Sequence, residues 1–312
     1  YLNTEPTTAS NLDKEYRPAS REEVFTLLKE DLDAAIDALS YELPVYNNGV
    51  MYGMYTKATA KHVRAQVAMW EEDWDCVIRQ TEEILLEAKG ITELEKDPAD
   101  IFSSENLRSK EILYAYQFSK NPGGGGTVKG TALAGHSISV YVTSRYSSVA
   151  GAVCASDQGG FGYGRDYPNQ HLLDMYGPKD KRIDCYFVTT FYYNDPASPK
   201  FGQPIVAGTG AGTSGASYIT NIHPMSSKHA DFWTNADDPE RKTSFRDLVV
   251  YRLAETVLMC AEVYYHKGDN TNAVKYFNMT YERAGNTAFN GTLTLEDLLD
   301  ELSLIHISEP TR

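Results

Sequence analysis

The chain has 312 residues, 42% of them hydrophobic and 23% charged, which excludes wholesale disorder and is enough to bury a sizeable core. Its formal net charge is −14 at pH 7 with no cluster of Lys and Arg, which argues against a nucleic-acid partner and favours a neutral ligand. No stretch reaches the roughly 18 apolar residues of a transmembrane helix, so we expect this segment not to span a bilayer.

An amphipathic helix is predicted near the start of the chain. Ser20 and Glu23 have the spacing of a capping box, in which each side chain bonds to the backbone of the other residue. Hydrophobic residues then recur at helical spacing to about Leu39. Pro44 and the run 47–49 (Asn-Asn-Gly) mark the loop that follows.

A helical hairpin is predicted next. Thr56 is a good N-cap for a helix to about Glu71, and a third helix runs from about Trp74 to Ala88. Because the loop between them is so short, the two helices must be antiparallel neighbours. We expect Trp70 and Trp74, on either side of the turn, to lie in the core.

The composition changes over about residues 101–243, where glycine, proline, serine and threonine are frequent. Short strands are predicted at Ile112–Phe118 and Tyr186–Tyr193, where β-branched and aromatic residues concentrate, and a helix at about Asn169–Tyr176. Long irregular loops more often carry binding than form a core. We therefore expect the ligand region here.

A second helical hairpin is predicted near the end, with one helix from Phe245 to His266 and another from Thr271 to Ala284. Small residues at the crossing of each hairpin are typical of a tetratricopeptide (TPR)-like helix pair, with an ordinary helical bundle as the alternative. The predicted fold class is mainly α: TPR-like helical hairpins form a scaffold, and a long irregular loop-rich insertion carries short strands.

The predicted division of the chain follows these composition changes. Residues 1–100 form the N-terminal helical part, 101–243 a loop-rich insertion of the same domain, and 244–301 the C-terminal helical part. The remaining residues, 302–312, resemble translated sequencing-adapter read-through, so we expect this non-native tail to lie outside the fold.

Three segments resemble the SusD/RagB family. Residues 55–70 resemble a family helix that precedes a short turn, and residues 251–262 (Tyr-Arg-Leu-Ala-Glu-Thr-Val-Leu-Met-Cys-Ala-Glu) are similar to the family pattern Arg-Tyr-Ala-Asp-x-x-Leu-Met-x-Ala-Glu. Residues 168–176, followed by 179–182, resemble Pro-x-x-x-Leu-Leu-x-x-Tyr with Asp-x-Arg. As a departure, residues 278–285 lack the first Arg of the family's Asn-x-Val-Arg-x-Arg-Ala-Gly.

This resemblance implies a non-enzymatic protein of the cell outer membrane. Such a protein binds an oligosaccharide or other nutrient at the cell surface and delivers it to a TonB-dependent, SusC-like outer-membrane transporter. It implies a lipid anchor as the only membrane contact, and we expect the anchor and its export signal to be missing from this sequence. No cofactor is implied.

The resemblance also implies a shallow glycan site on loops, where aromatic faces cover sugar C–H patches and polar side chains bind hydroxyls. The best candidate is the loop 161–167, with packing of its aromatics under the loop as an equal alternative. Its ligand-binding residues would be Phe161, Tyr163, Arg165, Asp166 and Tyr167.

Two further places are candidates for the same site. Tyr141 and Tyr146 flank Arg145, although packing is favoured for them, and Trp233 could be a sugar platform or the anchor of a turn. Metal sites are not predicted, because the four cysteines form no Cys-x-x-Cys pair and the histidines share no ligand spacing.

Two functions of other classes remain as alternatives. A TPR-like scaffold that binds a partner peptide would be favoured if the middle region lacked an exposed aromatic platform. A secreted glycoside hydrolase ranks last, since it needs two carboxylates facing each other across one pocket.

Overall fold

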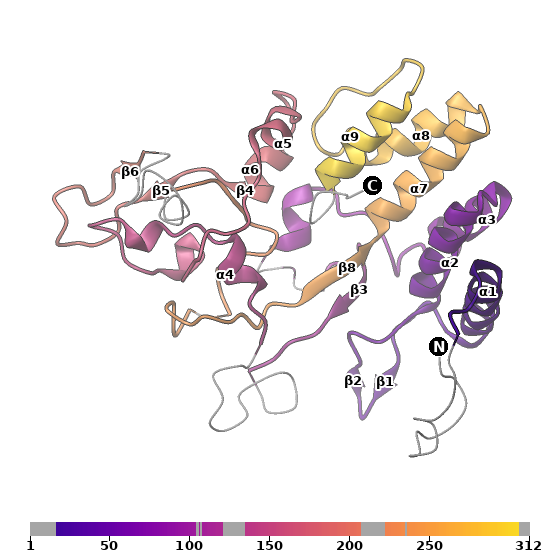
Figure 1. Ribbon diagram of the computed structural model, residues 1–312, viewed down its shortest axis with the longest axis horizontal. Coiled ribbons are helices and arrows are strands. Elements are labelled where there is room, and N and C mark those ends of the chain that lie inside the picture. Colours follow the sequence, from indigo (N-terminus) through magenta and orange to yellow (C-terminus); the bar gives the residue numbers. More distant parts are fainter. Residues whose placement is uncertain are drawn as a thin grey trace.

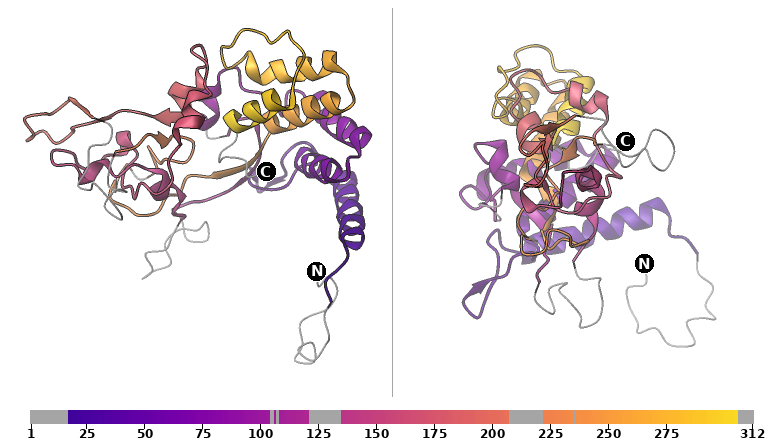
Figure 2. Two further views of the ribbon diagram at one scale, coloured as in Figure 1. Left: turned by 45° about the horizontal axis from the view of Figure 1, so that its top comes forward. Right: turned by 90° about the vertical axis from the view of Figure 1, so that its left-hand side faces the viewer.

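A computed structural model describes residues 17–103, 106, 108–120, 135–206, 222–234 and 236–305. The longer helices gather at one end of the molecule and the loop-rich segment, with short helices, forms the other, with a two-stranded ribbon between them (Figures 1 and 2). The prediction of a mainly α fold with a loop-rich insertion is confirmed. The TPR-type assignment of the hairpins and the boundaries of the predicted parts stay predictions, and the glycine run 123–126 lies outside the described residues.

The N-terminal helices form where the sequence predicts them. The first, α1 (Arg21–Ala38), begins with both bonds of the predicted capping box. The hairpin consists of α2 (Lys57–Glu71), capped by the Thr56 side chain, and α3 (Trp74–Glu87). The turn between them passes through a left-handed residue at position 72, which lets the chain reverse within two residues.

One tryptophan prediction for this turn is wrong. Trp70 is 74% exposed, because it lies in the last turn of α2, beyond the buried residues of this helix, which end at Ala68. Trp74 does pack inward, with its indole stacked on the His266 ring at a centroid distance of 4.7 Å.

The second hairpin consists of α7 (Leu253–His266) and α8 (Asn270–Tyr281), and α9 (Leu295–Ile305) packs against α7. The two hairpins meet where α3 packs on α7, so the helices from the N-terminal and C-terminal parts of the chain share one core. Small side chains, including Ala68 and Ala261, are fully buried there and permit the close approach. Cys76 and Cys260 are also buried in this scaffold, as free thiols.

The prediction of one helix from Phe245 to His266 is wrong in its first part. Residues Leu248–Arg252 form the strand β8, which pairs antiparallel with β3 (Ile112–Tyr116), and α7 begins only at Leu253. The sequence of β8, Leu-Val-Val-Tyr-Arg, suits a strand, and its partner lies far away in the chain. This β3–β8 ribbon runs from the helical end toward the loop-rich end (Figure 1).

The loop-rich end is built from short elements. Its helices are α4 (Ile138–Val142), α5 (Gln170–Asp174) and α6 (Arg182–Tyr186), with short 3-10 turns at Pro98–Phe102, Tyr146–Ser148 and Ser156–Gln158. Its strands pair as β4 (Phe187–Val188) with β7 (Met225–Ser226) and β5 (Phe191–Tyr192) with β6 (Pro204–Ile205).

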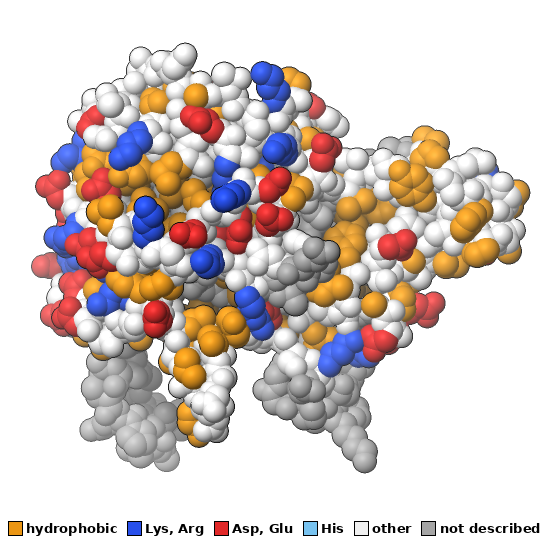
Figure 3. Space-filling view, turned by 180° about the vertical axis from the view of Figure 1, so that it is seen from behind, with side chains coloured by type: hydrophobic (Ala, Val, Ile, Leu, Met, Phe, Trp, Pro, Cys, Tyr) orange, Lys and Arg blue, Asp and Glu red, His pale blue; other side chains and the backbone are white. Residues whose placement is uncertain are grey.

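A small hairpin, β1 (Val45–Tyr46) and β2 (Gly49–Val50), projects from the helical end. Seen from behind, hydrophobic side chains lie along this projection (Figure 3). Tyr46 is 68% exposed.

Buried ion pairs join the two ends. The Arg182 guanidinium of α6 lies 2.6 Å from the Asp180 carboxylate and 2.8 Å from the Glu301 carboxylate of α9. The fully buried Glu111 carboxylate bonds the guanidinium groups of both Arg252 and Arg283. Each of these buried charges has a partner of opposite sign, so removing one side chain alone would leave an uncompensated buried charge and be costly.

The expectation that residues 302–312 lie outside the fold is wrong for residues 302–305. They form the last turn of α9, in which Leu302, Leu304 and Ile305 are buried, and the Tyr176 hydroxyl donates to the Leu304 carbonyl at 3.3 Å. The helical spacing of these hydrophobic residues matches the apolar face of α9, which explains their burial. Residues 306–312 lie outside the described residues.

Candidate ligand-binding site

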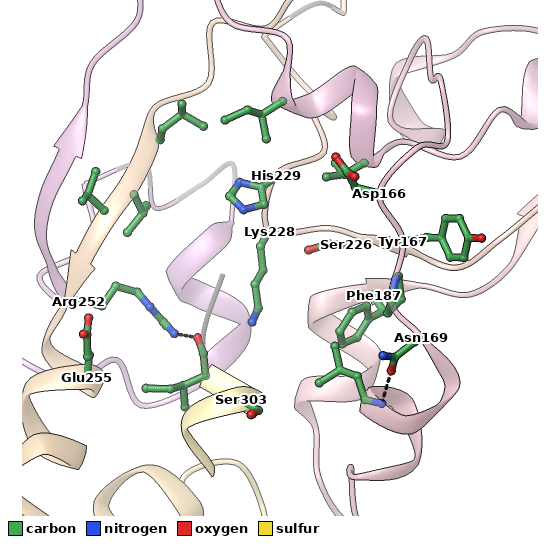
Figure 4. A pocket seen from close by; sticks show the side chains of 18 of the residues that line it. Asp166, Tyr167, Asn169, Phe187, Ser226, Lys228, His229, Arg252, Glu255 and Ser303 are labelled. Atoms are coloured by element: carbon green, nitrogen blue, oxygen red, sulfur yellow. Dashed lines mark hydrogen bonds between the residues drawn. The ribbon is translucent and has the colours of Figure 1, made fainter. Parts of the chain in front are cut away.

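A cavity of about 970 Å³ lies between the helical end and the loop-rich end. One wall comes from β8 and the start of α7, and the opposite wall from the loop before α5 (Figure 4). Lys228 and His229, which follow β7, lie between the two walls. The lining includes Arg165, Asp166, Tyr167, Asn169, Leu172, Phe187, Ser226, Lys228, His229, Leu248, Val249, Tyr251, Arg252, Glu255, Ser303 and Ile305.

The loop 161–167 is bound to α4 through its backbone. The Tyr163 N–H donates to the Val140 carbonyl at 2.6 Å, and the Arg165 N–H donates to the Tyr141 carbonyl at 2.8 Å. Gly162 allows this contact, since a Cβ there would lie only 2.3 Å from the carbonyl oxygen of Thr143. The loop is therefore a structured edge of the cavity.

Two of the predicted aromatics support a charged residue of this loop. The Arg165 guanidinium lies over the rings of Tyr141 and Tyr163, 5.4 and 5.2 Å from their centroids. Phe161 packs edge-on against Tyr163 at 5.1 Å. None of these three aromatic side chains lines the cavity, whereas Arg165 does. Because the guanidinium lies over the rings of Tyr141 and Tyr163, these rings hold Arg165 in place at the cavity edge.

The other predicted residues of this loop reach the cavity directly. Asp166 and Tyr167 both line it, and Tyr167 remains 41% exposed. The Tyr167 ring is stacked on the His223 imidazole, with centroids 4.1 Å apart and planes 4° apart. This stacking fixes the orientation of an aromatic ring beside the cavity.

Two predicted site residues lie elsewhere. Tyr146 is fully buried in the core of the loop-rich end, stacked on Phe191 at 5.2 Å, and its hydroxyl donates to the Ala155 carbonyl. The packing alternative therefore holds for Tyr146, and its predicted role in ligand binding is wrong. Trp233 is half-buried under the Arg246 guanidinium and is not part of the cavity lining.

Sequence reasoning missed the inner residues of the cavity. Lys228 is buried, and its Nζ lies 4.2 Å from the centroid of the Tyr186 ring. Burial, together with the nearby guanidinium groups of Arg252 and Arg182, holds the pKa of Lys228 well below its usual value. Nothing local in the sequence marks this lysine, since its neighbours come from distant segments.

The wall formed by β8 and the start of α7 carries side chains that other residues hold in place. Arg252 bonds the Ile305 carbonyl and lies 3.4 Å from the Glu111 carboxylate. Glu255, at the start of α7, accepts from the Gln66 amide at 2.9 Å and lies 3.5 Å from the His62 ring. On the other wall, the side-chain oxygen Oδ1 of Asn169 caps α5 by accepting from the Leu172 N–H at 2.8 Å.

The cavity thus combines apolar surface with hydrogen-bonding groups of both kinds. Carboxylates and hydroxyls accept or exchange hydrogen bonds with sugar hydroxyls, a guanidinium donates, and aromatic or aliphatic faces cover C–H patches. Among the residues that the structure describes, no group of three or more His, Cys, Asp or Glu side chains could hold a metal ion. Within the same residues, no helix is long and apolar enough to cross a membrane.

Comparison with known proteins identifies the family. A family model, that of the SusD family, matches residues 99–301, which is more than half of the chain. The chain belongs to the SusD family. The resemblance seen in the sequence is thereby confirmed, although the similar segment 55–70 lies outside the matched range. No curated protein matches this SusD-family chain.

Solved structures share its fold at low sequence identity. Surface glycan-binding protein A from Bacteroides uniformis is 19% identical and matches with a TM-score of 0.66, over 94% of this chain and 56% of its own. The same-named protein from Bacteroides thetaiotaomicron, in complex with laminarihexaose, is 20% identical with a TM-score of 0.63, over 91% and 57%. A SusD superfamily protein from Bacteroides fragilis is 18% identical with a TM-score of 0.64, over 92% and 58%. This SusD-family chain therefore spans less than two thirds of each of these proteins.

Proposed function

We propose that this chain binds a neutral oligosaccharide in the cavity between its two ends and performs no chemistry on it. The observation that carries the proposal is the placement of Arg165, Asp166 and Tyr167 on a structured loop at the cavity edge. A guanidinium, a carboxylate and a fixed aromatic ring are the groups that sugar recognition uses. The bound laminarihexaose of a protein with the same fold supports this ligand class.

The family supports a wider role for the whole protein. Held at the surface of the outer membrane by a lipid anchor, it would capture the oligosaccharide and deliver it to a TonB-dependent, SusC-like transporter. The net charge of −14 supports a neutral sugar over an anionic one, because the chain repels anions at long range.

Calorimetric titration tests the proposal. Laminarihexaose, maltohexaose and cellohexaose are titrated into the wild-type chain and into Arg165→Ala and Asp166→Asn. Each variant removes a charged hydrogen-bonding group at the cavity edge, so we expect about a tenfold rise in the dissociation constant of the sugar that binds.

Matched controls come from residues of the same type outside the cavity lining. Arg145→Ala and Asp157→Asn should bind as the wild type does. If none of the three hexasaccharides binds, or if the cavity variants bind like the controls, the proposal is wrong. Chromatography of the recovered sugar adds a second check, since shortened products would indicate glycoside hydrolase activity and contradict the proposal.

A further inference from the structure

Four tyrosines form a cluster on and beside the β3–β8 ribbon. The Tyr55 ring, just before α2, is stacked on Tyr114 of β3, with centroids 4.6 Å apart and planes 18° apart. Tyr114 also meets Tyr116 edge-on at 5.5 Å and Tyr251 of β8 at 6.4 Å. We call Tyr55, Tyr114, Tyr116 and Tyr251 the tyrosine cluster.

The outer members of the cluster are exposed while the inner members are held in place. Tyr55 is 57% exposed and Tyr116 is 56% exposed. A hydrogen bond with the Tyr55 side chain raises the pKa of Tyr114 to about 12, so the Tyr114 phenol is neutral at physiological pH. Tyr251 packs against the buried His62 ring at 4.9 Å, which anchors the cluster to the helical scaffold.

The tyrosine cluster is continuous with the cavity. Tyr116 and Tyr251 line the cavity, whereas Tyr55 lies outside it and extends the aromatic surface beyond the rim. An aromatic path therefore leads from the cavity along the ribbon to the N-terminus of α2.

We infer that the tyrosine cluster is a second part of the glycan site and that the ligand is an extended neutral oligosaccharide, bound at one end in the cavity and stacked at the other on the cluster. This inference rests on the proposed function. Phenol rings held in place by mutual stacking offer flat apolar faces with polar tips, which match the C–H faces and hydroxyls of pyranose units.

Continuity with the cavity favours a sugar over a protein partner as the occupant. All four cluster residues carry a hydroxyl and none carries a charge, which suits a ligand rich in hydroxyls. The neighbouring β1–β2 hairpin differs, since its exposed side chains include the aliphatic Val45 and Val50.

Chain-length dependence of binding tests the inference. Each hexasaccharide of the titration panel and its disaccharide are titrated into the wild type, Tyr55→Ala and Tyr116→Ala. Tyr46→Ala is the matched control, because Tyr46 is 68% exposed on β1 and outside the cluster. We expect Tyr55→Ala to raise the dissociation constant of the hexasaccharide about tenfold and to change that of the disaccharide less than about twofold.

The outcomes separate this inference from the proposed function. If the hexasaccharide binds and Arg165→Ala weakens it, but Tyr55→Ala and Tyr116→Ala both bind it as the wild type does, the cluster is not part of the site and only this inference fails. If Tyr55→Ala weakens hexasaccharide and disaccharide equally, the extended binding mode is wrong. If no sugar of the panel binds the wild type, both proposals fail. Melting curves of each variant show whether a loss of binding reflects a loss of folding.

Discussion

Replacing Gly162 by alanine should disturb the binding loop without removing any side chain that could touch a ligand. The new Cβ would lie 2.3 Å from the Thr143 carbonyl oxygen and 2.4 Å from that of Ser144. Both atoms belong to the backbone, so the loop must move away from α4 by several tenths of an ångström. That movement stretches the hydrogen bonds of Tyr163 and Arg165 to α4.

The magnitude follows from these contacts. Overpacking costs about 1 to 3 kcal/mol, and each weakened backbone hydrogen bond adds about 1 kcal/mol or less. We expect Gly162→Ala to lower the free energy of unfolding by about 2 to 4 kcal/mol. Since Arg165 and Tyr167 move with the loop, sugar affinity should fall as well.

Denaturant unfolding and sugar titration of the one variant measure both effects. Gly177→Ala is the control, because the nearest atom to its Cβ would be the Asn286 Oδ1 at 3.5 Å, an ordinary contact. Its free energy of unfolding should stay within about 1 kcal/mol of the wild type. If Gly162→Ala matches this control in both stability and affinity, the backbone hydrogen bonds of Tyr163 and Arg165 do not hold the loop against α4.

Two further predictions concern the inner cavity and the end of α9. Lys228→Met should raise the melting temperature at neutral pH. A lysine whose pKa is lowered in the folded state costs stability at every pH below its unfolded pKa of about 10.5, because it must be buried charged or lose its proton. The gain from Lys228→Met should therefore vanish as the pH rises to that value. Melting curves across this pH range test it, and a variant less stable than the wild type at neutral pH would contradict it. Deleting residues 302–312 should destabilise the fold by on the order of 3 kcal/mol or more, because three buried hydrophobic side chains are lost. The difference in melting temperature between this deletion and a shorter one of residues 306–312 gives the contribution of residues 302–305. If the longer deletion leaves the melting temperature unchanged, α9 does not need its last turn.

Local signals in the sequence predicted the helical scaffold well. The capping box at Ser20, the N-cap at Thr56 and the short turn before Trp74 each act within a few residues, so they can be recognised without knowing the fold. The same holds for the loop 161–167, whose alternation of glycine and aromatic residues drew attention to Arg165 and its neighbours.

Elements that depend on distant partners were predicted less well. The segment 248–252 reads as part of a long apolar helix, yet it forms a strand because β3, more than a hundred residues earlier, pairs with it. Tyr141 and Tyr146 both flank Arg145 at short range, and only packing decides that Tyr146 is buried against Phe191 while the Tyr141 ring lies under the Arg165 guanidinium.

The sequence by itself therefore determined the helical hairpins, their caps and the family, because each of these depends on residue patterns of short range. Tertiary structure alone decided which side chains share the cavity, since Arg165, Lys228 and Glu255 come from three segments that only the folded chain brings together. It also decided the tyrosine cluster, where residues before α2, on β3 and on β8 meet. Stacking and burial act between atoms that are close in space, and no short-range pattern encodes which distant residues those will be.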